Sequence, residues 1–192
     1  SLSPYQVIEK INAIINDDAI IIPECGANLC WVYQIFHRKN HTIFTSFGNS
    51  PMGFTLPASI GASLFANGRQ VIGILGDGGF QMNIQELQAV SFHNIPLKIF
   101  IINNESLGNT KFPANKMFGR STGNNIDGGY GWPDFTEVAK AYKIRGKVFN
   151  SNTNIELELE KILNSKESCL VDVKIDPNQF SDHYPVEGVI KW

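Results

Sequence analysis

Two polar side chains follow apolar runs of the sequence and belong to the types that bind a hard metal ion. Asp77 comes two residues after the apolar run 71–75, and Asn104 comes two residues after the apolar run 97–102. Mg²⁺ prefers oxygen ligands and is usually held by one or two protein groups together with phosphate oxygens and water. We therefore expect Asp77 and Asn104 to bind Mg²⁺, with the backbone carbonyl of Ser106 as a further ligand.

The glycines beside Asp77 indicate what else binds there. Gly78 and Gly79 have no side chains, so the backbone can approach a phosphate closely, and the helix that they begin offers free N–H groups to an anion. Gly-Asp-Gly alone is a common tight turn, and Asn-Asn alone is an ordinary end of a strand. The two clusters, however, lie about one strand–helix–strand step apart, and each ends an apolar strand. Together they predict a metal-bound diphosphate. The motifs of nicotinamide and nucleoside triphosphate sites are missing from the sequence.

The spacing of apolar residues predicts the elements that position these groups. Helices are expected over residues 4–15, 27–36, 54–66, 83–93, 133–142 and 153–163, and strands over residues 19–22, 42–45, 71–75, 97–102, 145–149 and 169–175. This alternation predicts an α/β fold with a three-layer, doubly wound, mainly parallel sheet and helices on both faces. Such sheets bind ligands beyond the carboxyl ends of their strands, where Asp77 and Asn104 fall.

Residues 109–132 interrupt the alternation. This segment is long and rich in Gly and Asn, with little apolar periodicity. A loop of this length in a compact domain is often a mobile part of an active site. We therefore expect residues 109–132 to form a loop that becomes ordered when a ligand binds. Two interpretations of Lys111 within it stay open: contact with a substrate carboxylate, or a solvated loop lysine.

Length, charge and cysteine content limit the class of protein. A chain of 192 residues is most simply one domain, residues 1–192. The formal net charge of −2 argues against nucleic acid or an anionic membrane as a partner. Cys25, Cys30 and Cys169 show no CxxC spacing, which favours a reduced, cytoplasmic chain. No apolar run approaches the length that spans a membrane.

The sequence resembles the C-terminal, diphosphate-side domain of thiamine-diphosphate enzymes of the acetolactate (acetohydroxyacid) synthase type. The resemblance covers about residues 19–175 and is strongest over residues 47–58, Phe-Gly-Asn-Ser-Pro-Met-Gly-Phe-Thr-Leu-Pro-Ala, and over residues 76–108. It implies the thiamine-diphosphate-binding fold, the cofactors thiamine diphosphate and Mg²⁺, and metal ligation by Asp77, Asn104 and the Ser106 carbonyl. The residues that it implies as cofactor contacts are Gly26, Ala27, Asn28, Ser50, Met52, Gly76, Asp77, Gly78, Gly79, Asn104, Leu107 and Gly108.

Some of these positions have particular roles in the family. Met52 matches the large apolar residue that holds the cofactor in a bent form, although without its flanking residues it would be interpreted as core packing. The Ser50 carbonyl and the Met52 N–H match contacts to the aminopyrimidine. Ala27 and Asn28 stand where the synthases usually have Gln-His, which keeps the backbone donors and alters the side-chain contacts. The tryptophan that shapes the substrate pocket of the synthases is absent here, so we do not expect specificity for an added 2-oxobutyrate.

The resemblance also implies a partner. The family takes the glutamate that acts on the pyrimidine from a separate pyrimidine-binding domain, usually of the neighbouring subunit. We find no candidate for it here: Glu86 is expected at the surface or in packing, and Glu24 lies at a strand end near the site without an assigned role. We therefore expect no catalytic residue in this chain, inactivity when it is alone, and a homo-oligomer, a dimer or a tetramer.

The resemblance predicts a function as the C-terminal part of a transferase or lyase that decarboxylates or carboligates a small 2-oxo acid such as pyruvate. Two alternatives stay open. The chain could be the cofactor-binding subunit of a two-subunit 2-oxo-acid decarboxylase of the sulfopyruvate decarboxylase kind, or a non-catalytic binding domain of the same fold. The length of the native open reading frame separates the first two readings, and cofactor binding tests the third.

Overall fold

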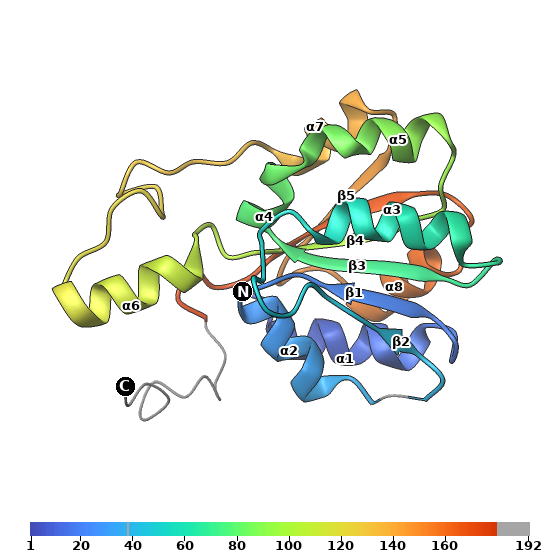
Figure 1. The fold of residues 1–192 in the computed structure, drawn as a ribbon, viewed down its shortest axis with the longest axis horizontal. Coiled ribbons are helices and arrows are strands. Elements are labelled where there is room, and N and C mark those ends of the chain that lie inside the picture. Colours follow the sequence, from blue (N-terminus) through green and yellow to red (C-terminus); the bar gives the residue numbers. More distant parts are fainter. Residues whose placement is uncertain (38, 180–192) are drawn as a thin grey trace.

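The computed structural model describes residues 1–37 and 39–179, which are built around a six-stranded sheet. The strands lie in the order β2-β1-β3-β4-β6-β5, and every neighbouring pair is parallel (Figure 1). The strands are β1 (Ile20–Pro23), β2 (Thr42–Ile43), β3 (Val71–Gly76), β4 (Lys98–Asn103), β5 (Arg145–Phe149) and β6 (Cys169–Lys174). The predicted α/β fold with a parallel sheet is confirmed.

Helices cover both faces of this sheet. The helices are α1 (Pro4–Ile14), α2 (Ala27–Ile35), α3 (Thr55–Phe65), α4 (Asp77–Met82), the 3-10 turn η1 (Ile84–Glu86), α5 (Leu87–Phe92), α6 (Gly108–Phe118), α7 (Phe135–Ala141) and α8 (Ile155–Leu163). Helices α1, α2 and α8 lie on one face, and α3, α5 and α7 lie on the other (Figure 1). None of the helices in the described part of the chain combines the length and the apolarity needed to cross a membrane.

The four inner strands β1, β3, β4 and β6 are buried on both sides, and successive side chains along each of them point to opposite faces of the sheet. In β4, Phe100 and Ile102 pack in the core shared with α1, α2 and α8, whereas Ile99 and Ile101 pack in the core shared with α3, α5 and α7. A strand buried in this way appears in the sequence as a continuous apolar run. That pattern located the strands and therefore the polar residues at their carboxyl ends.

Two predicted helices differ from the structure because a polar side chain ends or begins a helix nearby. The helix predicted over residues 83–93 consists of η1 and α5. It begins only at Ile84, because Asn83 ends α4 with φ −136° and its side chain donates a hydrogen bond to the Gly53 carbonyl. The helix predicted from residue 133 begins at Phe135. Its N-cap is Asp134, whose carboxylate accepts hydrogen bonds from two backbone N–H groups of the first turn.

The prediction of a loop over residues 109–132 was wrong for its first part, which belongs to α6. This helix projects away from the sheet (Figure 1), and Lys111 is its one fully buried residue. A helix without a core-facing side needs no apolar stripe, which explains why the sequence shows no helical periodicity there. The helix ends at Gly119, which adopts φ +67°. The mobility of the remaining residues 120–132 stays a prediction.

Candidate functional site

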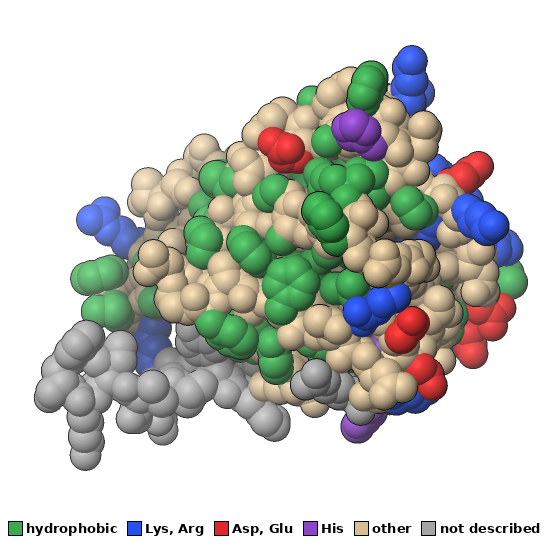
Figure 2. All heavy atoms as spheres, turned by 45° about the vertical axis from the view of Figure 1, so that its right-hand side comes forward, with side chains coloured by type: hydrophobic (Ala, Val, Ile, Leu, Met, Phe, Trp, Pro, Cys, Tyr) green, Lys and Arg blue, Asp and Glu red, His purple; other side chains and the backbone are tan. Residues whose placement is uncertain are grey.

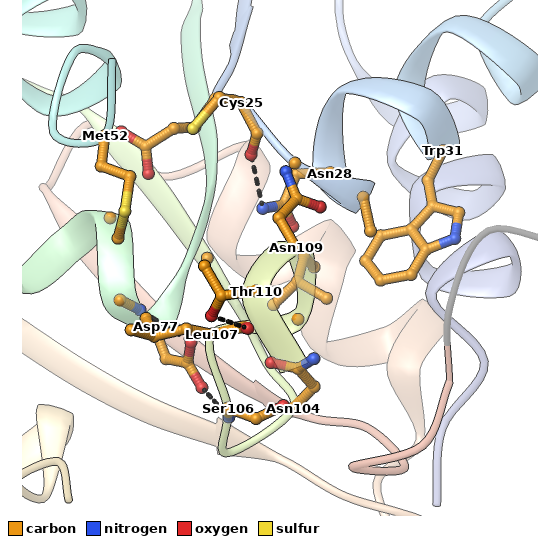
Figure 3. Close-up of a pocket in the computed structure, with 18 residues that line it drawn as sticks. Cys25, Asn28, Trp31, Met52, Asp77, Asn104, Ser106, Leu107, Asn109 and Thr110 are labelled. Carbon is orange, nitrogen blue, oxygen red and sulfur yellow. Dashed lines mark hydrogen bonds between the residues drawn. The ribbon is translucent and has the colours of Figure 1, made fainter. Parts of the chain in front are cut away.

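A pocket opens at the carboxyl ends of β1, β3 and β4, the edge where the sequence predicted a ligand. The fold brings together here predicted site residues from distant parts of the sequence (Figure 3). They are Gly26, Ala27, Asn28, Met52, Gly76, Asp77, Gly78, Gly79, Asn104, Ser106, Leu107 and Gly108. Ser50 is not part of the lining, and its contact with a cofactor stays a prediction.

Three helices begin at this pocket. Helices α2, α4 and α6 start after Gly26, Gly76 and Leu107, and none of these three N-cap residues makes a side-chain capping hydrogen bond. The first N–H groups of a helix have no partner within the helix and carry a partial positive charge. Among residues 1–37 and 39–179, no lysine or arginine lines the pocket. The pocket therefore suits an anion that is bound by backbone N–H groups.

Asp77 presents a buried carboxyl at the start of α4. Only 2% of its surface is exposed, and its oxygens accept hydrogen bonds from the backbone N–H groups of Gly78 (2.7 Å) and Ser106 (3.2 Å). Burial raises the pKa of Asp77 to about 7, against the effect of these hydrogen bonds. The ion pairs of the described residues do not include Asp77. A divalent cation would supply the missing positive charge.

The donor set around Asp77 fits Mg²⁺ better than a transition metal. No group of three or more His, Cys, Asp or Glu side chains in the described part of the chain is arranged to hold a metal by itself. Mg²⁺ does not need such a group, because it is commonly bound by one or two carboxylates, water and the phosphate oxygens of a ligand. One carboxyl beside neutral oxygens and an anion site is consistent with that mode of binding.

The two asparagines at the end of β4 have different surroundings. Asn103 is fully buried: its amide nitrogen donates to the Asp172 carboxylate (2.9 Å), and its side-chain oxygen accepts from the Glu105 N–H (3.1 Å). Asn104 lines the pocket instead. Glu105 adopts φ +57°, so the chain turns sharply between the two asparagines and the start of α6. Asn103 thus stabilises the turn, and Asn104 faces the pocket.

Ser106 and Leu107 complete this side of the pocket. The Ser106 hydroxyl is buried and has no hydrogen-bond partner within the described residues. The Leu107 N–H donates to the Asn124 carbonyl (2.8 Å), so the segment after α6 folds back and holds the turn in place. Figure 3 shows Ser106 joined to Asp77, with Asn104 beside them. Metal ligation by the Ser106 carbonyl stays a prediction.

The opposite wall is the turn between β1 and α2. Gly26 adopts φ +89°, a conformation that favours glycine. Asn28 is buried, and its amide nitrogen lies 3.5 Å from the Cys25 carbonyl that accepts its hydrogen bond. Its side-chain oxygen has no partner among the described residues. A buried amide oxygen without a donor costs free energy, so Asn28 is suited to accept a hydrogen bond from a bound group.

Met52 lies at the mouth of the pocket and not in the core. Its surface is 40% exposed, which excludes the interpretation of Met52 as a core-packing residue. Its terminal methyl group lies 3.1 Å from the point that a Cβ on Gly78 would occupy. The thioether therefore rests against the glycine backbone at the start of α4, and any side chain at residue 78 would crowd it.

Six pocket residues had no assigned role in the sequence interpretation. They are Glu24, Cys25, Trp31, Ile102, Asn109 and Thr110. Asn109 and Thr110 were missed because α6 was interpreted as a loop. For Glu24 the sequence did carry a signal, its place at the end of a strand beside the predicted diphosphate turn.

Lys111 and Glu86 lie outside the pocket lining. Both interpretations of Lys111 were wrong: it is buried, and its ammonium group donates to the Pro177 carbonyl (3.0 Å) and to the Asn178 side chain (3.4 Å). It fastens α6 to the segment after β6 rather than meeting solvent or substrate. Glu86 is half-buried in η1, in agreement with a surface or packing role.

The fold and the pocket define an α/β protein whose parallel strands end at a pocket, where three helices start beside a buried carboxyl that forms no ion pair within the described residues. Comparison with known families is more specific. Residues 24–173 match the sequence model of the thiamine pyrophosphate enzyme C-terminal TPP-binding domain, where thiamine pyrophosphate (TPP) is another name for thiamine diphosphate. The chain belongs to this family.

Proteins named as acetolactate synthases are similar to this chain over nearly all of its length. A probable acetolactate synthase large subunit of Methanococcus aeolicus is 33% identical over 183 residues, which cover 92% of this chain and 30% of the relative. The acetolactate synthase large subunit of Lactococcus lactis is 32% identical over a region that covers 93% of this chain and 31% of the relative. The acetolactate synthase isozyme 1 large subunit of Escherichia coli is 30% identical over a region that covers 93% of this chain and 32% of the relative. The chain thus spans about a third of the length of these relatives.

Proposed function

We propose that this chain binds the diphosphate of thiamine diphosphate through Mg²⁺, as the C-terminal part of a 2-oxo-acid decarboxylating or carboligating enzyme resembling acetolactate synthase. The observation that supports this most is the pairing of the buried Asp77 carboxyl with three helix starts in one pocket. A diphosphate without a metal would be repelled by that carboxylate. A diphosphate with Mg²⁺ would satisfy both the carboxylate and the helix N–H groups.

The pocket residues divide by their chemistry on this proposal. Asp77, Asn104 and the Ser106 carbonyl are the proposed Mg²⁺ ligands. Ser50 and Met52 are proposed to contact the aminopyrimidine end. The residues proposed to surround the diphosphate are Gly26, Ala27, Asn28, Gly76, Gly78, Gly79, Leu107 and Gly108.

When bound, the thiamine ring system supplies the electron sink for the carbon–carbon chemistry. The residues of this chain bind and orient it. Gly76 and Gly78 leave the backbone free to approach the diphosphate, and the missing side chain of Gly79 makes room for the Glu24 carboxylate. Met52 offers an apolar surface at the mouth of the pocket. The acid–base group at the pyrimidine is proposed to come from a separate pyrimidine-binding domain, so this chain alone is inactive.

A large apolar surface is consistent with such a partner. Figure 2 shows hydrophobic side chains gathered on the face formed by α3 and α5. Leu64 and Phe65 of α3 are 59% and 85% exposed, and Phe92 of α5 is 72% exposed. Apolar patches of this kind usually mark contacts with another protein surface. We propose that another domain or subunit of a homo-oligomeric enzyme covers them, and that the substrate is a small 2-oxo acid such as pyruvate.

The metal assignment is tested by Asp77→Ala in the full-length protein. Losing a partner of a metal ligand costs about 10–100-fold in affinity, so losing the charged ligand should weaken thiamine diphosphate binding in Mg²⁺ by at least about 100-fold. Titration calorimetry measures the affinity, and circular dichroism checks that the fold is kept. The matched control is Asp18→Ala, an exposed aspartate before β1, at the other end of that strand from the pocket. Equal affinity of Asp77→Ala and wild type would refute the proposed function.

A further inference from the structure

Glu24 is a second buried carboxyl in the pocket, and the proposed function does not use it. It follows β1 directly, is 1% exposed and lines the pocket. One carboxylate oxygen accepts hydrogen bonds from the backbone N–H groups of Gly53 (2.7 Å) and Thr55 (3.4 Å). The rest of the carboxylate lies against Gly79 at the start of α4. A side chain on residue 79 would overlap it.

These contacts join three separate segments of the site. Glu24 itself belongs to the turn that leads to Gly26 and α2. Gly53 belongs to the turn that carries Met52 and leads into α3, and Gly79 belongs to the proposed diphosphate turn. One side chain therefore contacts both the Met52 turn and the glycine backbone of α4.

Gly53 is held from both sides. Its N–H donates to Glu24, and its carbonyl accepts a hydrogen bond from the Asn83 side chain (2.7 Å), which follows α4. Its φ is +87°, and a Cβ at this position would lie 2.8 Å from both Met82 and Asn83. Gly53 is thus clamped between the end of β1 and the end of α4, with little room to shift.

The burial of a carboxyl here needs a reason beyond packing. The ion pairs of the described residues do not include Glu24, and burial raises its pKa to about 7 although backbone hydrogen bonds lower it. A side chain that only filled space would avoid this desolvation cost. The feature that Glu24 supplies is an acceptor at a fixed distance from both walls of the pocket.

We propose that Glu24 is a positioning residue that sets the separation between the Met52 turn and the proposed diphosphate turn. The proposal rests on the proposed function of the pocket. It assigns Glu24 no contact with the cofactor and no proton transfer. Its consequence is that moving the acceptor should harm binding of the whole cofactor more than binding of the diphosphate group alone.

The test uses two variants that separate acceptor position from charge. Glu24→Asp keeps the carboxylate but withdraws it by about 1.5 Å, the length of one carbon–carbon bond. Glu24→Gln keeps an oxygen acceptor at the original distance and removes the charge. Each is made in the full-length protein and titrated, in Mg²⁺, with thiamine diphosphate and with inorganic diphosphate as separate probes. Hydrogen exchange at the Gly53 amide reports on the contact itself.

We expect Glu24→Asp to bind thiamine diphosphate about tenfold more weakly, because the hydrogen bond to Gly53 is weakened. Its affinity for inorganic diphosphate should change by less than about threefold, and hydrogen exchange at the Gly53 amide should be faster. Glu24→Gln should stay within about threefold of wild type for both probes. Equal losses for both probes in Glu24→Asp, no loss at all, or the same loss in both variants would overturn the inference. A wild-type protein that binds neither probe would instead refute the proposed function of the pocket.

Discussion

The pocket holds two carboxyl groups whose surroundings separate their roles. The Asp77 carboxylate accepts hydrogen bonds from the N–H groups of Gly78, at the start of α4, and of Ser106, on the side of the pocket where Asn104 lies. The Glu24 carboxylate accepts hydrogen bonds from backbone N–H groups of Gly53 and Thr55, which follow Met52. Because neither forms an ion pair within the described residues, burial dominates, and it raises the pKa of each to about 7. The free energy of folding of the metal-free protein must therefore depend on pH.

The pH dependence has a definite sign. The pKa of Glu24 is raised from 4.5 to about 7, so the folded state binds the proton more tightly than the unfolded state. Its contribution to stability is fully present below about pH 4.5 and is lost as the pH rises through about 7. The loss is on the order of 3 kcal/mol for a shift of this size. Cys25 and Asp77 are the other titratable groups in the pocket, and they are retained in a Glu24→Gln variant.

Comparison of wild type with Glu24→Gln therefore isolates Glu24. We expect the free energy of unfolding, measured by urea denaturation of the metal-free protein, to fall between about pH 5 and about pH 8 in both proteins. The fall should be smaller in Glu24→Gln by on the order of 2–3 kcal/mol, since the amide does not titrate. The same fall in both proteins would show that Glu24 titrates alike in the folded and unfolded states.

Helix α6 and the segment after it show how an element can serve the site without joining the core. The start of α6 lines the pocket, whereas its far end projects from the body (Figure 1). The following segment returns to the site: Asn124 accepts from Leu107 (2.8 Å), and the Tyr130 hydroxyl accepts from the Gln81 side chain (2.7 Å). These few polar contacts are the kind that open easily.

We expect residues 120–132 to gain protection from hydrogen exchange when thiamine diphosphate and Mg²⁺ bind. The reason is that the segment packs on the same turns that the ligand would order. Exchange of the full-length protein with and without the ligands measures it, and residues 150–153, the surface turn between β5 and α8, serve as the internal control. If residues 120–132 exchange at the same rate in both states, the segment does not act as a lid.

The sequence predicted the sheet well because its four inner strands, β1, β3, β4 and β6, are buried on both faces and leave apolar runs. It also predicted the polar residues of the pocket, since Asp77 and Asn104 follow such runs directly. It failed for α6, which has no core-facing stripe, and for Glu24, whose partners are backbone N–H groups about 30 residues away. The hydrogen bonds of Glu24 depend on how separate turns meet in the folded chain, so no local sequence pattern predicts them.

The described part of the molecule has one pocket wall that is proposed to bind a diphosphate, and an exposed apolar face over α3 and α5 (Figure 2). A reaction at one open wall would leave water in contact with the reacting atoms and weaken every electrostatic interaction there. The proposed second wall would exclude that water and contribute the missing acid–base group. The site on this view is completed by association.

We therefore expect the chain of residues 1–192 alone to release no carbon dioxide from pyruvate or other 2-oxo acids, even with Mg²⁺ and thiamine diphosphate in excess. Addition of a matching pyrimidine-binding domain should restore turnover, and a version of that domain without its glutamate should not. A carbon dioxide assay gives the rate. Turnover by the isolated chain at about 1 per second or faster, as in an ordinary enzyme, would contradict the expectation.

The lack of any lysine or arginine in the lining of this pocket, among the described residues, has a thermodynamic consequence. With no basic side chain to neutralise a diphosphate, the two ligands of the proposed site depend on each other. Whatever factor Mg²⁺ adds to the affinity for thiamine diphosphate, the cofactor must add to the affinity for Mg²⁺, because coupling between bound ligands is reciprocal. Chelation of the metal should therefore release the cofactor, and a fall in free cofactor should in turn loosen the metal.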